Sequence, residues 1–179
     1  MRLIVLILLV GVLNADARVG ENMLQCAQRY GSPITNIMDR SMPILTGPGA
    51  SNVTYRYQGW LIRMAFVDGY ACIPDYQKEY RREQPSNIDD SEFQAILRAY
   101  QPEPWSETKR TVELNPSKAL SSAMRRMGDG PSWESRSGFL AFRRPGGSIV
   151  RIVNKAALAS FEARNQKAKE ASRTPIPQF

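Results

Sequence analysis

The sequence predicts an α+β fold in which an antiparallel sheet of about five to six strands carries helices on one side. Three observations lead to this class. Short apolar runs alternate in strand fashion, amphipathic stretches with helical spacing lie between them, and turn residues such as Asp-Gly separate the strands. Because short turns join neighbouring strands, antiparallel pairing is expected.

Residues 1–17 have the features of a secretory signal peptide. A positively charged start precedes the apolar run Leu3–Leu13, and Ala15-Asp16-Ala17 supplies small residues at the cleavage positions. As a helix this run would rise only about 16 Å, against a hydrocarbon core of about 30 Å, so a transmembrane anchor is not expected. Cys26 lies too far downstream for lipid attachment. We expect cleavage after Ala17 and a periplasmic or extracellular mature chain.

The first half of the mature chain reads as a helix followed by a three-stranded meander. Apolar residues at helical spacing and a Gly-Ser-Pro stop predict a helix over Glu21–Tyr30. The strands are predicted at Val53–Tyr57, Trp60–Val67 and Tyr70–Tyr76, with turns at Gln58-Gly59 and Asp68-Gly69.

A two-residue turn at Asp68-Gly69 sets the register of the second hairpin. It pairs Val67 with Tyr70, Ala65 with Cys72, and Met64 with Ile73. One face of the meander then carries Trp60, Ile62, Met64, Phe66, Ala71 and Ile73, and the other carries Leu61, Arg63, Ala65, Val67, Tyr70 and Cys72. Both faces are apolar enough to need cover.

The two cysteines, Cys26 and Cys72, allow one intramolecular disulfide in the oxidising compartment that the leader implies. Such a bridge would stabilise the fold by roughly 4 kcal/mol in the loop-entropy description. It would also place the first helix on the Cys72 face of the meander. Two buried thiols or a redox pair are the alternatives, but a redox pair lacks the Cys-x-x-Cys spacing.

The second half repeats the pattern of helices and strands. Asp89-Asp90 caps a predicted helix over Ser91–Tyr100, whose Phe93, Ile96, Leu97 and Tyr100 form an apolar stripe. The further elements are a strand at Trp105–Leu114, a helix at Ser117–Met127, strands at Trp133–Phe142 and Ser148–Val153, and a helix from Lys155 to about Glu170. Only Leu158 and Phe161 mark an apolar face on that last helix, so its second half should be solvated.

These elements define the expected domain organisation. A single α+β domain covers residues 18–155, with possible subunits at 21–77 and 89–155 built as two helix-plus-hairpin repeats. A C-terminal helix follows over 156–171, and the Pro-containing tail 172–179 should be disordered. A short sequence match, Leu24–Arg29 with Phe93–Arg98, suggests a duplication, although chance explains so short a match equally well.

The net charge of +7 is unevenly placed. Positive and negative side chains balance up to residue 100, so the surplus lies in the second half. A basic surface on an exported protein could meet lipid head groups, cell-wall carboxylates or an acidic protein, and it could equally be a solvated surface with no specific partner. Nucleic acid is not expected as a partner of an exported chain.

The segments Tyr57-Gln58-Gly59-Trp60 through Val67-Asp68-Gly69-Tyr70, and Trp133 with Gly138-Phe139-Leu140-Ala141, look like a pattern seen in uncharacterised exported bacterial proteins. The order helix, meander, helix, meander resembles the fold shared by the β-lactamase-inhibitor protein and the SmpA/OmlA outer-membrane assembly lipoproteins, over most of residues 21–155. The chain departs from the lipoproteins because it has no lipidated cysteine at the mature N-terminus. The resemblance implies a protein-binding scaffold and transfers no site residue.

The chain contains no histidine, which removes histidine-based nucleophile systems, histidine general bases and ordinary zinc sites. Ser106 and Lys109 have the S-x-x-K spacing of serine acyl-transferases, but the companion motifs are missing. Asp89, Asp90 and Glu92 could serve glycoside hydrolysis, yet their place at a helix start fits capping. No catalytic residue, metal site or cofactor is predicted.

We therefore expect an exported, non-enzymatic domain that binds a protein or an anionic envelope component. The alternative is an envelope-polymer hydrolase that uses the carboxylates or Ser106 with Lys109. Two contact surfaces are predicted, an aromatic face and a basic stretch. They comprise Trp60, Ile62, Met64 and Phe66, and Arg125, Arg126, Arg143, Arg144 and Arg151.

Overall fold

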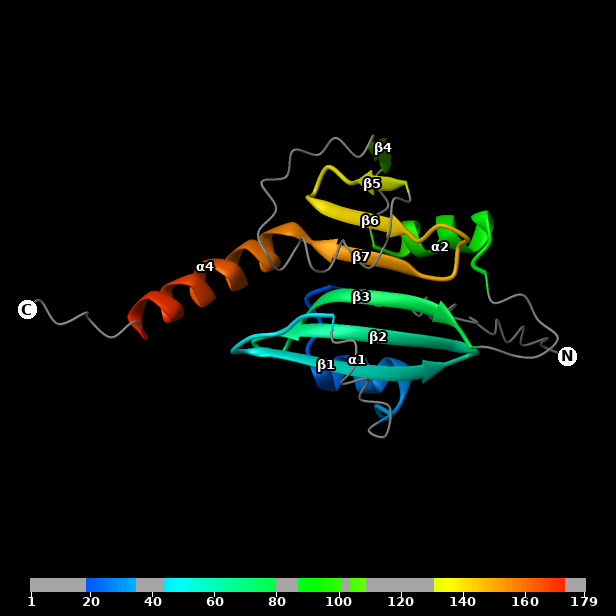
Figure 1. Ribbon diagram of the computed structural model, residues 1–179. Coiled ribbons are helices and arrows are strands. Elements are labelled where there is room, and N and C mark those ends of the chain that lie inside the picture. Colours follow the sequence, from blue (N-terminus) through cyan, green and yellow to red (C-terminus); the bar gives the residue numbers. More distant parts are fainter. Residues whose placement is uncertain (1–18, 35–43, 80–86, 101–103, 109–130, 173–179) are drawn as a thin grey trace, which may run out of the picture.

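The computed structural model describes residues 19–34, 44–79, 87–100, 104–108 and 131–172. Within these residues the chain forms one antiparallel seven-stranded sheet, ordered β1-β2-β3-β7-β6-β5-β4, and three helices (Figure 1). The strands are β1 (Ala50–Tyr57), β2 (Trp60–Val67), β3 (Tyr70–Lys78), β4 (Ser106–Thr108), β5 (Ser132–Glu134), β6 (Phe139–Arg143) and β7 (Val150–Asn154). The helices are α1 (Met23–Tyr30), α2 (Asp90–Tyr100) and α4 (Lys155–Ala171).

The α+β class is confirmed, and the sheet has one strand more than the range expected from the sequence. The run predicted as a single strand over Trp133–Phe142 is divided by a turn into β5 and β6. In that turn Gly138 has a φ of +84° and donates to the Ser135 carbonyl, while the Ser135 hydroxyl accepts from the Phe139 N–H. A glycine adopts this φ without strain, which explains the break.

Both turns of the first meander form as predicted. Gln58-Gly59 and Asp68-Gly69 have positive φ at both positions, as two-residue hairpin turns require. Val67 pairs with Tyr70, but the register shifts between Ala65 and Phe66, so that Ala65 faces Ile73. The predicted pairings of Ala65 with Cys72 and of Met64 with Ile73 are therefore wrong, because a β-bulge adds one residue to β3 at this point. Ile73, predicted on the Met64 face, lies with Cys72 in the buried cluster of the other face.

Helix α1 begins at a capping box, in which the Asn22 and Gln25 side chains each accept from the other's backbone N–H. Its buried side chains are Cys26 and Tyr30. Cys26 Sγ lies 3.7 Å from Met64 Sδ on β2, and the Tyr30 ring packs against tyrosine rings of β1. Helix α1 therefore covers the face of β1 and β2 that carries Met64.

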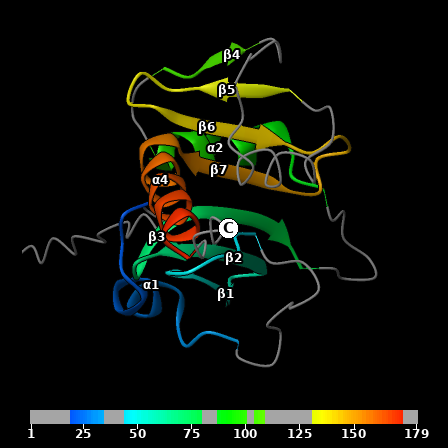
Figure 2. The same cartoon turned by 60° about the vertical axis from the view of Figure 1, so that its left-hand side comes forward.

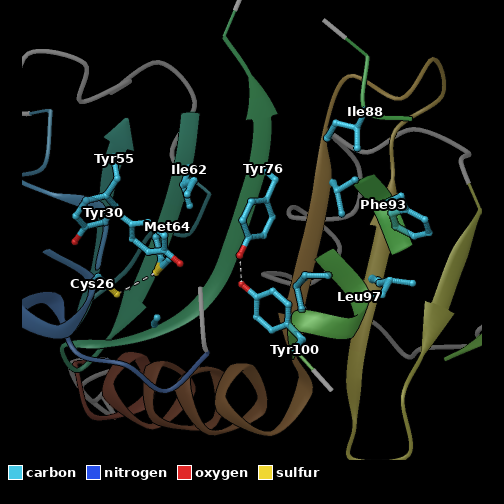
Figure 3. Close-up of a cluster of buried hydrophobic side chains, with 14 of the residues drawn as sticks. Cys26, Tyr30, Tyr55, Ile62, Met64, Tyr76, Ile88, Phe93, Leu97 and Tyr100 are labelled. Carbon is cyan, nitrogen blue, oxygen red and sulfur yellow. Dashed lines mark hydrogen bonds between the residues drawn. The ribbon is translucent and has the colours of Figure 1, made fainter. Parts of the chain in front are cut away.

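Helix α2 lies on the same face as α1, over the other half of the sheet. Its Phe93 ring packs 4.5 Å from the Trp133 ring on β5, and its Leu97 carbonyl accepts from Trp105 Nε1. At the centre of the face the hydroxyls of Tyr76 and Tyr100 hydrogen-bond to each other, between the α1 contacts and the α2 contacts (Figure 3). One buried cluster thus joins both helices to the sheet.

The order of elements agrees with two helix-plus-meander units that meet at β3 and β7. Each helix begins with a capping box and covers its own meander. Aligning the caps Asn22 and Asp89 matches buried Cys26 with buried Phe93. The short sequence match noted above differs from this structural alignment, since it aligns Leu24 with Phe93. Leu24 is exposed whereas Phe93 is buried, so the two residues are not structurally equivalent.

Helix α4 packs on the opposite face of the sheet, so the expectation of helices on one side is wrong for this helix (Figures 1 and 2). Its Leu158 and Phe161 join a second buried cluster with residues of β2, β3, β6 and β7. Burying these two side chains contributes about 1.5–3 kcal/mol each. The turns after Asn165 are exposed, which confirms the prediction of a solvated second half.

Candidate functional site

The basic stretch at the end of β6 lies beside the start of α2. Arg143 donates from Nη2 to the Ile88 carbonyl at 2.6 Å and from Nη1 to Asp90 at 2.5 Å. Its guanidinium also lies 5.4 Å from the centre of the Phe93 ring. Arg143 therefore fastens the end of β6 to α2, and its charge is compensated.

Arg144 follows at the β6–β7 turn and is exposed. Its backbone N–H donates to Ile149, and its carbonyl accepts from Gly147, which closes the turn. Within the described part of the chain, its guanidinium forms no hydrogen bond or ion pair. The cation is therefore presented to solvent from a fixed backbone.

A pocket of about 540 Å³ lies between this turn and the segment before α2. It is lined by Lys78, Asn87, Ile88, Asp89, Pro131, Arg143, Arg144, Pro145, Gly146 and Gly147. Gly147 has a φ of +70°, and a Cβ there would lie 3.0 Å from the Ile88 carbonyl oxygen. Only glycine allows this approach at low cost, so the pocket wall depends on it. The sequence predicts Arg143 and Arg144 as part of a basic contact surface, but it gives no sign that this turn and the segment before α2 line one pocket.

The carboxylates beside the pocket serve structural roles. Asp89 accepts from the Ser91 hydroxyl and the Glu92 N–H, and these bonds lower the pKa of Asp89. Glu92 accepts from the Asp89 N–H and pairs with Lys78 at 2.7 Å. Asp90 pairs with Arg143. These contacts agree with the helix-capping interpretation rather than with a pair of acid and base catalysts.

The proposed Ser106 and Lys109 pair gains no support. Ser106 is exposed on the short strand β4. Lys109 lies outside the described residues.

The aromatic face predicted as a contact surface is part of the core. Ile62, Met64 and Phe66 are buried beneath the helix-covered face, and Trp60 is half-buried with Lys78 Nζ 6.0 Å from its ring centre. The prediction of this surface is wrong for the three buried residues, because α1 packs on them. From the sequence, the first helix is expected on the Cys72 face only because a Cys26–Cys72 disulfide is expected.

Arg151, predicted as part of a basic surface, is 3 % exposed and pairs with Asp75 inside the sheet. Nε and Nη2 each donate to one carboxylate oxygen at 2.5 Å, and Arg63 lies 3.6 Å from the same carboxylate. Burial opposes the charge, but the Asp75 carboxylate outweighs it, so the pKa of Arg151 is raised. The surface prediction is wrong here because Asp75 neutralises the cation. Arg125 and Arg126 lie outside the described residues.

The expected disulfide is not present, since Cys26 and Cys72 are both free and buried. They belong to the two separate clusters on opposite faces of the sheet. A bridge would need their Cβ atoms within about 4 Å, which an intervening sheet prevents. The prediction failed because α1 covers the Met64 face rather than the Cys72 face.

Burial raises the pKa of both thiols to about 12. In the unfolded chain a thiol ionises near pH 9, so each buried thiol stabilises the fold fully below pH 9 and progressively less as pH rises toward 12. Between pH 9 and pH 10 we expect a loss of about 1 kcal/mol per thiol, because the thiol of the unfolded chain is already half ionised at pH 9. Urea unfolding at both pH values should show a smaller loss for Cys72→Ala than for the wild type. Equal losses would contradict a raised Cys72 pKa.

Among the described residues, no three side chains of the metal-binding kinds lie together. None of the described helices is long and apolar enough to cross a membrane. No protein-family model matches this chain, and neither the curated proteins nor the solved structures give a match. The resemblance suggested by the sequence therefore stays a prediction.

Proposed function

We propose that the mature chain is an exported, non-enzymatic domain that binds an anionic group of a protein or envelope component beside the β6–β7 turn. The exposed guanidinium of Arg144 at the edge of the pocket is the observation that carries this proposal. The leader-like N-terminus supports export, and the absence of histidine supports a binding role.

The charges around the pocket favour an anion at Arg144. Arg143 is compensated by Asp90, and Lys78 by Glu92. Asp89 is held by its helix-capping hydrogen bonds. Ile88, Pro131 and Pro145 also line the pocket. An anionic ligand with an apolar portion would therefore suit the pocket.

Charge reversal by Arg144→Glu tests the proposal. We expect about a tenfold loss of retention on phosphatidylglycerol vesicles, isolated cell wall or immobilised polyglutamate, whichever retains the wild-type chain. Retention should also fall with added salt, because exposed charges are screened. Co-sedimentation and column binding measure these effects, and the three supports distinguish lipid, polymer and polypeptide ligands.

Arg136→Glu is the matched control, since Arg136 is exposed on the turn at the other end of β6. Its change in net charge equals that of Arg144→Glu. Equal losses for both variants would show a general effect of net charge. Wild-type retention that is absent on all three supports, or insensitive to salt, would count against the proposal.

A further inference from the structure

Helix α4 is attached to the sheet through a small part of its surface. Its buried side chains are Leu158 and Phe161, both in the first half of the helix. Further along, Arg164 pairs with Asp68 at the β2–β3 turn, and both side chains are about half exposed. Figure 2 shows α4 in front of the sheet, running from β7 across β3 toward β2.

An apolar strip of the sheet belongs to the same cluster as these two anchors. It comprises Ala65, Val67, Cys72, Ile73, Leu140, Phe142 and Val153. The segment Ile44–Leu45 also joins the cluster, held by the Asn52 side chain, whose amide donates to Leu45 at 2.7 Å. Gly47 lies close to Phe161, so this segment and α4 meet at one ring.

The helices on the other face are tied on both sides or bury more side chains. Helix α1 buries two side chains, as α4 does, whereas the ties of α4 lie at its start, where Lys155 pairs with Glu134, and at Arg164. Residues on both sides of α1 are tied to strands, with Gly20 donating to Ala71 and Ile34 donating to Thr54. Helix α2 buries Phe93, Leu97 and Tyr100 and is fastened further by Arg143. Elements with few buried apolar contacts open before the rest of a fold.

We propose that α4 is a detachable strap, which swings away from the sheet as a unit while the α1 and α2 face stays folded. Opening uncovers the apolar strip over β2, β3, β6 and β7 and so controls access to that face of the protein. The strap lies on the face opposite α2 and does not depend on the proposed anion site.

The two free cysteines provide matched reporters of this motion. Cys72 lies in the α4 cluster, and Cys26 lies beneath α1 on the other face. Both are fully buried, so each reacts with a thiol reagent only when its own face opens. Opening of the strap should expose Cys72 alone, whereas global unfolding exposes both.

The experiment is alkylation of the full chain with excess iodoacetamide under native conditions, followed over time by peptide mass mapping. We expect Cys72 to react at least about tenfold faster than Cys26. Phe161→Ala should accelerate Cys72 by about a hundredfold and leave Cys26 unchanged. Equal rates at both cysteines in the wild type and in Phe161→Ala would overturn the proposal.

Two further variants keep the test decisive. Leu97→Ala weakens the α2 face and should accelerate both cysteines, as a control for global unfolding. Arg164→Ala removes only the exposed ion pair with Asp68, and we expect about a twofold faster reaction at Cys72 alone. If Phe161→Ala fails to fold, Arg164→Ala still tests the proposal. Equal changes in the alkylation rates of both cysteines, or no change at Cys72, would refute the proposal that α4 opens as a unit.

Discussion

Replacing Asp75 with alanine should lower the free energy of unfolding by about 3–5 kcal/mol. Asp75 is 0 % exposed and accepts two hydrogen bonds from Arg151, with Arg63 3.6 Å away. The substitution would leave the Arg151 cation buried without its carboxylate, and the desolvation cost of that charge would no longer be offset. Urea unfolding followed by circular dichroism measures the loss.

A double variant separates the ion pair from the shape of the site. Asp75→Leu combined with Arg151→Met replaces both charges with apolar groups of similar size, and such replacements are often neutral or stabilising. We expect it to recover most of the stability lost by Asp75→Ala, limited by the remaining charge of Arg63. A single Asp75→Ala loss below about 1 kcal/mol would show that Arg151 is solvated rather than buried.

Phe93→Ala is expected to cost about 3–5 kcal/mol. The ring is 2 % exposed, packs on Trp133 and supports the guanidinium of Arg143. Its loss leaves a cavity between α2 and β5 and also loosens Arg143 at the pocket wall. Chemical denaturation gives the stability change, and retention on the anionic support chosen above gives the effect on the pocket.

Gln94→Ala provides the control, because Gln94 is exposed on the same helix. It should change the free energy of unfolding by less than about 0.5 kcal/mol. Similar losses for Phe93→Ala and Gln94→Ala would mean that α2 does not cover the sheet through Phe93.

Local signals in the sequence were sufficient for the elements near tight turns and caps. Asp68-Gly69 predicts a hairpin because its backbone must adopt positive φ, and Phe93 with Leu97 marks the buried stripe of α2. These signals act between neighbours in the chain. The α+β class and most strands follow from them.

Long-range packing decided what the sequence could not predict. From the sequence alone Arg151 is predicted to be a surface cation. Its partner Asp75 lies far away in the sequence and comes beside it only because β3 pairs with β7. The bulge at Ala65 shifts β3 by one residue, and no local residue type announces it. No local signal indicates which face of β2 is covered by α1. The expected Cys26–Cys72 disulfide placed α1 on the Cys72 face, whereas α1 packs on the Met64 face.

The strand order of the sheet also bears on how fast the protein folds. Its two meanders form from neighbouring segments, but the centre joins β3 to β7, where Asp75 meets Arg151 across 76 positions of sequence. Closing so long a loop is entropically costly and slows folding. We therefore expect the two hairpin systems to appear early and their junction to form in the slow, rate-limiting step.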